Sequence, residues 1–313
     1  MTPRSPQLNA HEATSMVRTV IKHHFDLNPR RIFAQTGGLS NFVFSVDHRE
    51  GDFVVRLSPE PAGLNVYLKE KWATEKARQI GIPAPNILEV GQDVISHPYM
   101  ISKRVKGEDA TRHLNRSEIL KELGALASQI NSIKTVGFGD RFDWSEQEST
   151  KVASWQDYLT DELKLNDRLT VFEETGMLSK SQLARIRGVF ECATRMKFEP
   201  VLNHGDLRLK NVVVNKSGKI LAIIDWEKSS SNLAPHWELS LALHDLTIDE
   251  KDEFLEGYGI RAEQMQRMAP LVKAFNLVNY AREVEKAVKS KETDKVERYR
   301  MRLSGALDMY SLE

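Results

Sequence analysis

The sequence has a single cysteine, Cys192, among its 313 residues. One thiol cannot form a disulfide within the chain, and this composition is typical of proteins from a reducing compartment. The surrounding segment, GVFECATRM, reads as the interior of a helix. We therefore expect a packed thiol at Cys192 rather than a nucleophile.

The sequence also has no excess of charge of either sign, because it contains 44 Lys and Arg residues and 44 Asp and Glu residues. A protein that binds nucleic acid through electrostatics shows a clear basic excess. We therefore expect no nucleic-acid partner. No feature of the sequence indicates an oligomeric state.

Long hydrophobic runs are missing as well. The N-terminal segment MTPRSPQLNAHEATSMV is polar and lacks the apolar core of a secretory signal. No run approaches the roughly 20 apolar residues that a membrane-spanning helix needs. We therefore expect a soluble, cytoplasmic protein without a membrane partner, and its length allows one large domain or two lobes.

The chain changes character near residue 105, without internal repeats or low-complexity linkers. Strands dominate before this point, and a turn-like HREGD (48–52) between two alternating runs predicts a hairpin. A helix is predicted over 64–80, where GIPAP ends it. The predicted strands cover 30–36, 41–47, 53–58, 86–93 and 97–105.

After KGEDA the pattern is mainly helical. The exception is NVVVN, a KSGK turn and ILAIIDW (211–226), which predict a short hairpin inserted among helices. The predicted helices cover 117–134, 178–197, 235–247 and most of 262–312. The sequence thus predicts an α+β fold with a small antiparallel-sheet lobe over 1–104 and a larger helical lobe over 105–313.

Three polar residues flank the predicted hairpin: Asp206 and Asn211 before it, and Asp225 at its far end. Antiparallel pairing would bring Asp225 back beside Asn211, and amide and carboxylate oxygens are hard ligands suited to Mg²⁺. Asp206 would then orient a substrate hydroxyl and accept its proton.

Two other interpretations of these residues stay open. Asp206 and Asn211 would close a turn if they acted only structurally. Alternatively, His204 and Asp206 would bind the metal of a hydrolase, which requires further His/Asp clusters that the other histidines do not form. We interpret His204 as a structural residue that hydrogen-bonds its loop.

The first lobe offers two candidate phosphate contacts. TGGLSN (36–41) lies between two predicted strands, where its backbone amides can approach phosphate oxygens, although a Gly-Gly pair is more often a turn. Arg56 interrupts an apolar strand, where an unpaired charge is costly. It therefore requires an anion, either Glu70 or a nucleotide phosphate, unless it faces solvent from an edge strand.

The motifs HGDLRLKN and IIDW, with GGLSN, VVRL, GIPAP and ISKRVKG in the same order, resemble those of the aminoglycoside phosphotransferase and choline kinase family. That family is related to the protein kinases. The resemblance implies a two-lobed protein-kinase-like fold and ATP and Mg²⁺ as cofactors. The segments GIPAPNILEVGQD, YMISKRVKGEDATRHL and GFGDRFD are further similar to hygromycin B phosphotransferases.

The resemblance also implies roles for individual residues. Asp206 falls at the position of the catalytic base, and Arg208 at that of a cation that contacts the γ-phosphate. Asn211 and Asp225 fall at the Mg²⁺ positions. The residues implied to bind nucleotide are Gly37, Gly38, Ser40 and Asn41, then Arg56 with Glu70 as its partner, and the backbone near Ser102 and Arg104 at the hinge.

The sequence departs from the family pattern in places. Arginine replaces lysine at position 56, which still allows phosphate binding. Glu75 is the alternative partner for Arg56 if the register of the helix is shifted. The segment NLAPHWELS lacks the usual aspartate before its helix, which leaves the bracing of the catalytic loop open.

The resemblance implies an ATP-dependent phosphotransferase whose partners are a nucleotide and a small molecule with a hydroxyl, foremost an aminoglycoside or hygromycin-like aminocyclitol. Such polycations would favour carboxylates, which the C-terminal part supplies, unless this acidic run is a solvated helix face. Four aromatic residues would line a pocket or belong to the core. The carboxylates are Asp245, Asp249, Glu250, Asp252 and Glu253, and the aromatic residues are Trp155, Tyr158, Trp226 and Trp237.

Two alternatives remain: a metabolic kinase for choline, homoserine, a sugar or a hydroxyacyl thioester, and a nucleotide-binding regulator without catalysis. The complete set of Asp206, Asn211 and Asp225 argues against the regulator, since a pure binding protein needs no base. A protein kinase is disfavoured because HGD and IDW replace HRD and DFG, and no Ala-Pro-Glu segment follows.

Overall fold

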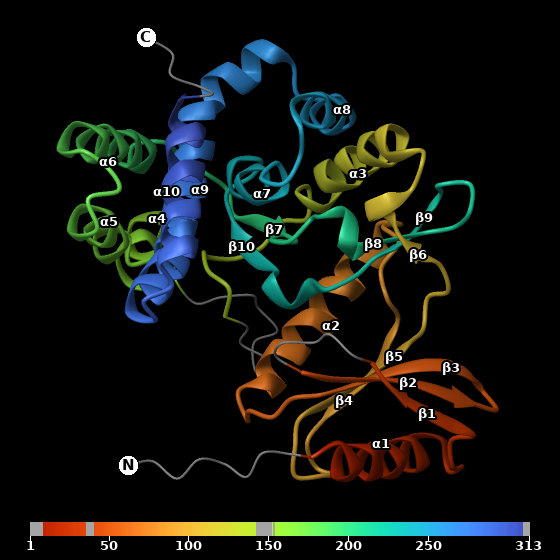
Figure 1. The fold of residues 1–313 in the computed structure, drawn as a ribbon. Coiled ribbons are helices and arrows are strands. Elements are labelled where there is room, and N and C mark those ends of the chain that lie inside the picture. Colours follow the sequence, from red (N-terminus) through yellow and green to blue (C-terminus); the bar gives the residue numbers. More distant parts are fainter. Residues whose placement is uncertain (1–8, 36–40, 142–151, 153, 309–313) are drawn as a thin grey trace. The chain divides into compact units, whose positions relative to one another are not determined.

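A computed structural model describes residues 9–35, 41–141, 152 and 154–308 (Figure 1). The chain divides into two compact units. The sheet unit comprises residues 1–116, 141–148 and 209–229, and the helical unit comprises residues 117–140, 149–208 and 230–313. The lobe boundary that we place between residues 104 and 105 stays a prediction.

The sheet unit is built on five antiparallel strands in the order β1-β2-β3-β5-β4. The predicted hairpin joins β2 to β3, where His48 pairs with Gly51. All five strands fall within the predicted segments or at most two residues beyond them. They are β1 (Arg31–Ala34), β2 (Phe42–His48), β3 (Gly51–Leu57), β4 (Ile87–Gly91) and β5 (Tyr99–Lys103).

Two helices lie on opposite sides of this sheet (Figure 1). Helix α1 (Ala10–Phe25) was not predicted, although its buried residues recur at helical spacing and Asn9 with Glu12 forms a capping box at its start. It packs on the face that carries Phe53, Val55 and Leu57. Because side chains alternate along a strand, Arg56 points to the other face, the side of α2 (Gly63–Gln79).

The predicted hairpin after HGDLRLKN is present in the sheet unit. It consists of β8 (Val212–Val214) and β9 (Ile220–Ile223), and β6 (Glu108–Asp109) pairs with β8. Gly218 has a φ of 87° at the turn, a left-handed conformation that glycine adopts without strain. The side chain of Asn215 accepts hydrogen bonds from the amides of Ser217 and Lys219 and so closes the turn.

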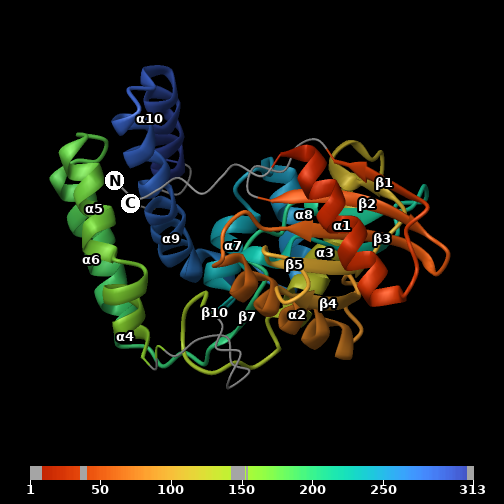
Figure 2. The same cartoon turned by 90° about the horizontal axis from the view of Figure 1, so that it is seen from below.

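The helical unit is organised around α9, against which α5, α6, α7 and α10 pack. Figures 1 and 2 both show α5 and α6 beside α9 and α10. Helix α5 (Leu165–Glu174) was not predicted. The other main helices are α3 (Arg116–Ile130), α6 (Lys180–Thr194), α7 (His236–Ala242), α8 (Ile248–Tyr258), α9 (Ala262–Lys289) and α10 (Thr293–Asp308), and the short strands are β7 (Val201–Asn203) and β10 (Ser230–Asn232).

Two of the predicted helices differ from the structure. The helix predicted over 235–247 ends at Ala242, because Thr247 caps the separate helix α8. The helix predicted over most of 262–312 consists of α9 and α10. Lys291 lies between them with a φ of 56°, a left-handed conformation that a continuous right-handed helix excludes.

Most of the candidate aromatic residues belong to cores. Trp155 and Tyr158 are buried in the core of the helical unit, and Trp237 packs against that core. Trp226 is fully buried in the sheet unit, where its indole nitrogen donates to the carbonyl of Ile223 at 2.8 Å. The expectation of a packed thiol is wrong, since Cys192 lies on α6 with its side chain exposed.

Helices α3 and α8 approach each other closely at two glycines. A Cβ atom on Gly124 would lie 2.1 Å from the carbonyl oxygen of Phe254. A Cβ atom on Gly257 would lie 1.9 Å from the carbonyl oxygen of Lys121. This contact therefore requires glycine at both positions.

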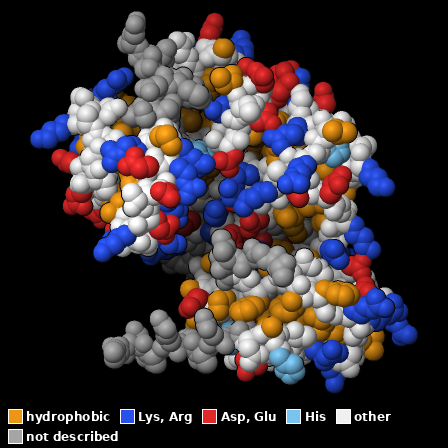
Figure 3. Space-filling view, in the orientation of Figure 1, with side chains coloured by type: hydrophobic (Ala, Val, Ile, Leu, Met, Phe, Trp, Pro, Cys, Tyr) orange, Lys and Arg blue, Asp and Glu red, His pale blue; other side chains and the backbone are white. Residues whose placement is uncertain are grey.

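No helix in the described part of the chain is both long and apolar enough to cross a membrane. On the face of the molecule that Figure 3 shows, acidic and basic side chains are interspersed. This mixture agrees with the formal net charge of zero.

Candidate functional site

In the sheet unit, Arg56 forms a buried ion pair with Glu70 of α2. Its Nη1 atom donates to both carboxylate oxygens of Glu70 at 2.9 Å. Only 13% of the Arg56 side chain and 4% of the Glu70 side chain are exposed. The structure thus confirms the predicted pair.

The two alternatives for Arg56 are wrong. Strand β3 lies between β2 and β5, so Arg56 is not on an edge strand. Glu75 approaches Lys71 on the same helix at 4.0 Å, and Glu70 is the residue that reaches Arg56. The register of α2 is therefore the one that the sequence predicted.

A second carboxylate, Glu227, completes the surroundings of Arg56. The Nη2 atom of Arg56 donates to Glu227 Oε2 at 3.0 Å, and its guanidinium carbon lies 5.4 Å from the ring centroid of Tyr67. Sequence reasoning missed Glu227, the middle residue of the short 3-10 turn η4 (Trp226–Lys228) that starts at the tryptophan of IIDW. The sequence indicated Glu227 only as a second carboxylate two positions after Asp225.

These charges keep Arg56 ionised. Burial acts to lower the pKa of Arg56, but the charges of Glu70 and Glu227 outweigh it and raise that pKa. Burial raises the pKa of Glu70, and the charge of Arg56 opposes this rise. Since a guanidinium does not lose its proton in proteins, the cluster presents a fixed cation.

The other predicted nucleotide contacts are partly described. The hydroxyl of Tyr67 donates to Asn41 Oδ1 at 3.0 Å. Ser102 is buried in β5, and the amide of Arg104 donates to the carbonyl of Asp52 at 2.9 Å. Gly37, Gly38 and Ser40 lie outside the described residues. The nucleotide roles of all these residues stay predictions.

The hairpin brings the two predicted magnesium positions together. Val212 pairs with Ile223, and the amide of Ile224 donates to the carbonyl of Asn211 at 2.8 Å, which places Asp225 beside the start of β8. Asp225 adopts a left-handed conformation with a φ of 68°, which costs a non-glycine residue about 1–3 kcal/mol. Such strain is often found at functional sites.

The donors at this position suit Mg²⁺, which binds one or two protein oxygens and fills its remaining positions with water and phosphate oxygens. The described residues contain no group of three or more His, Cys, Asp and Glu side chains that could hold a metal ion. Asn211 and Asp225 therefore fit a metal shared with phosphates better than a fully protein-bound one. The hydrolase metal considered for His204 and Asp206 lacks its further ligands in this part of the chain.

In the helical unit, Asp206 lies on a buried loop that follows β7. Arg208 contacts both of its carboxylate oxygens, through Nε at 2.5 Å and Nη2 at 2.8 Å. The Nη1 atom of Arg208 also lies 3.6 Å from Asp245 Oδ2. The Nη2 contact is a hydrogen bond and the Nε contact is an ion pair, and together they hold the Asp206 carboxylate beside the guanidinium.

Two buried residues hold this loop in place. His204 Nδ1 accepts a hydrogen bond from the amide of Asp206 at 3.2 Å, which confirms the predicted hydrogen bond of His204 to its loop. The Glu238 carboxylate of α7 accepts from the amides of His204 and Gly205 at 2.6 and 3.1 Å. The loop is therefore braced, although the usual aspartate before the helix is missing.

Sequence reasoning missed Glu238. Its signal was a single carboxylate in the otherwise uncharged segment HWELSLA, where a buried acid requires donors. Burial raises the pKa of Glu238 to about 7, while the bonds from the loop amides oppose this rise. Glu238 thus titrates close to neutral pH.

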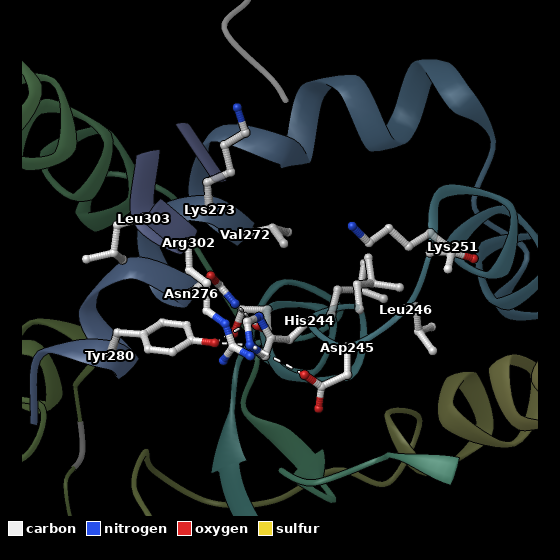
Figure 4. A pocket seen from close by; sticks show the side chains of 14 residues that line it. His244, Asp245, Leu246, Lys251, Val272, Lys273, Asn276, Tyr280, Arg302 and Leu303 are labelled. Atoms are coloured by element: carbon white, nitrogen blue, oxygen red, sulfur yellow. Dashed lines mark hydrogen bonds and ion pairs between the residues drawn. The ribbon is translucent and has the colours of Figure 1, made fainter. Parts of the chain in front are cut away.

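A pocket of about 470 Å³ lies in the helical unit (Figure 4). Of the five carboxylates predicted to meet a cationic acceptor, only Asp245 lines it. Lys251, Lys273 and Arg302 line it as well. None of the four aromatic residues considered for an acceptor pocket lines it.

The sheet, the helical unit and the braced HGD loop define the class of protein as a phosphotransferase with a protein-kinase-like fold. Residues 34–271 match the model of the phosphotransferase enzyme family, and the chain belongs to this family. A comparison with curated proteins finds no match.

Solved structures show the same fold. A crystal structure of the aminoglycoside phosphotransferase APH(4)-Ia is 18% identical with a TM-score of 0.69, over 94% of this chain and 98% of that chain. The complex of APH(2")-IIia with GDP and kanamycin is 15% identical with a TM-score of 0.64, over 95% and 98%. A complex of a thermostable APH(4)-Ia variant with ADP and hygromycin B is 17% identical with a TM-score of 0.68, over 95% and 99%. The predicted fold class is confirmed.

Proposed function

We propose that this protein transfers the γ-phosphate of MgATP to a hydroxyl group of a small molecule. The observation that supports this most strongly is the fixed carboxylate of Asp206, which Arg208 contacts at two points on a loop braced by Glu238. A side chain held in this way is suited to orient an alcohol and to accept its proton.

The sheet unit supplies the nucleotide contacts in this proposal. Arg56 contacts the α- and β-phosphates while Glu70 keeps its guanidinium in position. The glycine-rich segment with Asn41 covers the phosphates, and the backbone near Ser102 contacts the purine. Asn211 and Asp225 hold Mg²⁺, which neutralises charge on the phosphates when it is bound.

The reaction forms one bond and breaks one. The acceptor oxygen bonds to the γ-phosphorus as the bond between that phosphorus and the leaving oxygen of ADP breaks, and the hydroxyl proton passes to Asp206. Arg208 keeps Asp206 in orientation and contacts the transferred phosphoryl group. Asp206 and Asn211 are five positions apart, so the chain keeps their α-carbons within roughly 18 Å.

The structural neighbours bound to hygromycin B and kanamycin support an aminoglycoside or aminocyclitol acceptor, and with it a role in antibiotic resistance. The cations around the pocket favour the second candidate, a metabolic small-molecule kinase. A non-catalytic regulator would have no need for the braced Asp206. We place the enzyme in the cytoplasm because of its single cysteine.

The variant Asp206→Asn tests this function. It preserves the size of the side chain and removes the base, so we expect turnover to fall by roughly 10² or more while MgATP binding is retained. Asp225→Asn should instead weaken the binding of MgATP. If Asp206→Asn turns over ATP and acceptor at the rate of the unmodified protein, Asp206 is not the base.

A further inference from the structure

The pocket in the helical unit has the size of a small-molecule site. Its volume of about 470 Å³ lies within the range typical of ligand pockets, about 300–1,000 Å³. It is connected to the catalytic loop through Arg208, which contacts Asp206 on one side and Asp245, a lining residue, on the other. The pocket is therefore linked to Asp206 by two successive ion pairs, Asp245 with Arg208 and Arg208 with Asp206.

Cations dominate the charged side chains of this pocket. Lys251 comes from α8, Lys273 from α9 and Arg302 from α10, and the one carboxylate among the lining residues is Asp245. Figure 4 shows Lys251 and Arg302 reaching in from different helices on either side of His244 and Asp245. Three helices thus contribute one cation each to the same cavity.

The single carboxylate already contacts Arg208, a cation of the protein, and the ring of His244. Asp245 lies 3.6 Å from Arg208 Nη1 and 3.6 Å from His244 Nε2. A positively charged ligand would have to compete with Arg208 for it. The pocket therefore offers a polycation little electrostatic attraction.

The titration of the pocket residues agrees with a positive field. Burial lowers the pKa of His244, and the charges of Arg302, Lys251 and Arg208 lower it further against the effect of Asp245. Burial also lowers the pKa of Lys251 and brings the pKa of Lys273 to about 8. An anion bound beside these ammonium groups would favour their charged forms.

None of the other four carboxylates of this region lines the pocket. Among the described residues Lys251 forms no ion pair, although four acidic residues surround it in the sequence. Glu250 caps α8 through the amide of Thr247, and Asp249 and Asp252 are exposed. Of the acidic run that would attract an aminoglycoside, only Asp245 thus lines the pocket.

The remaining lining indicates a ligand with an apolar part. The apolar part of the wall consists of Leu243, Leu246, Val272 and Leu303. The hydroxyl of Tyr280, another lining residue, contacts His244. Hydrophobic wall with a few convergent polar groups is typical of small-molecule sites.

We infer that the acceptor is a small hydroxylated molecule that carries a carboxylate or a phosphate group, bound by Lys251, Lys273 and Arg302, and is not a polycationic aminoglycoside. This inference rests on the proposed function for the position of the acceptor. The anion is held at the cations while the hydroxyl lies toward Asp206.

Binding of matched ligand pairs tests the inference without requiring turnover. The pairs are gluconate with glucitol, glucose 6-phosphate with glucose, glycerate with glycerol, and glycerol 3-phosphate with glycerol, and kanamycin serves as the polycation. Binding is measured by calorimetry on the full chain with Mg²⁺ and a non-hydrolysable ATP analogue. Comparing the carboxylates (gluconate and glycerate) with the phosphates (glucose 6-phosphate and glycerol 3-phosphate) shows which kind of anion the pocket binds.

Two variants show whether the binding of an anion depends on the cations of the pocket. The double variant Lys251→Gln with Arg302→Gln removes two pocket cations, and Arg267→Gln removes an exposed cation of α9 that does not line the pocket. We expect at least one anion to bind more tightly than its neutral counterpart and than kanamycin. The double variant should weaken that binding by roughly tenfold or more, while Arg267→Gln should not change it.

Two results would overturn the inference: no anion binds better than its neutral counterpart, or the double variant and Arg267→Gln bind the anion equally. If kanamycin binds tightly and still does so in the double variant, an aminoglycoside would again be the preferred acceptor. Failure of the proposed function is separable, because loss of phosphoryl transfer would not abolish anion binding.

Discussion

Glu238 offers the sharpest test of how the HGD loop is held. The variant Glu238→Ala leaves the amides of His204 and Gly205 buried without their acceptor. An unsatisfied buried donor costs about 1–3 kcal/mol, so two donors should lower the free energy of unfolding by about 2–6 kcal/mol. The cavity left by the side chain adds to this loss.

Denaturant unfolding of the variant measures this loss, and steady-state kinetics measures its effect on the loop. Because the two amides immediately precede Asp206, we expect kcat to fall by more than tenfold while MgATP affinity changes little. Glu283→Ala, at an exposed position of α9, is the matched control. A loss below about 1 kcal/mol with unchanged kcat would refute the role of Glu238 as the brace.

The pH dependence of stability gives a second readout. The pKa of Glu238 is raised to about 7 in the folded protein from 4.5, so folding favours its protonated form. The protonated Glu238 carboxyl thus stabilises the folded protein. This stabilisation is fully present below pH 4.5 and is lost as the pH rises through about 7. Glu238→Gln, which retains a carbonyl acceptor and cannot titrate, should keep most of the stability and lack this decline. A parallel decline in both proteins would contradict the assigned pKa.

Two further predictions concern packing and charge. Arg56→Gln should weaken MgATP binding by roughly tenfold or more and destabilise the fold by about 3–5 kcal/mol, because Glu70 remains buried without its cation. Nucleotide titration and unfolding measure the two effects, and unchanged values would remove Arg56 from the site. Gly124→Ala should destabilise the helical unit by about 1–3 kcal/mol through its contact with Phe254, whereas Gly188→Ala, with no atom within 4 Å of the new Cβ, should be neutral or stabilising. Equal unfolding midpoints for the two glycine variants would contradict the packing described for α3 and α8.

The strands and the Arg56–Glu70 pair were predictable because their signals are local or follow a known spacing. Alternating apolar residues and turn residues define β2 and β3, and a charge in such a strand requires a partner on the neighbouring helix. Helix α1 has an equally local signal at Ala13, Val17 and Val20, which the polar character of the N-terminal segment masked.

The braces were not predictable in the same way. Glu227 reaches Arg56 across 171 positions, and Glu238 reaches His204 across 34. A lone carboxylate in the sequence has no periodicity, so only the tertiary fold shows which donors it meets.

The charge of the pocket in the helical unit was also hidden in the sequence. Its three cations lie on three different helices, and of the acidic run that the sequence showed only Asp245 lines the cavity. Helix orientation decides which side chains face a pocket, and it is fixed by packing rather than by composition.

The measurement that tests the account most directly is phosphoryl transfer from MgATP by the purified full chain. The acceptors are hygromycin B, kanamycin, choline, homoserine, simple sugars and the hydroxylated acids used for binding, with Asp206→Asn as the blank. The account predicts a phosphate ester of at least one acceptor, detected by ³¹P NMR, and its loss by roughly 10² or more in Asp206→Asn while nucleotide binding persists. Ester formation at an unchanged rate in Asp206→Asn, or no ester from any acceptor, would contradict it.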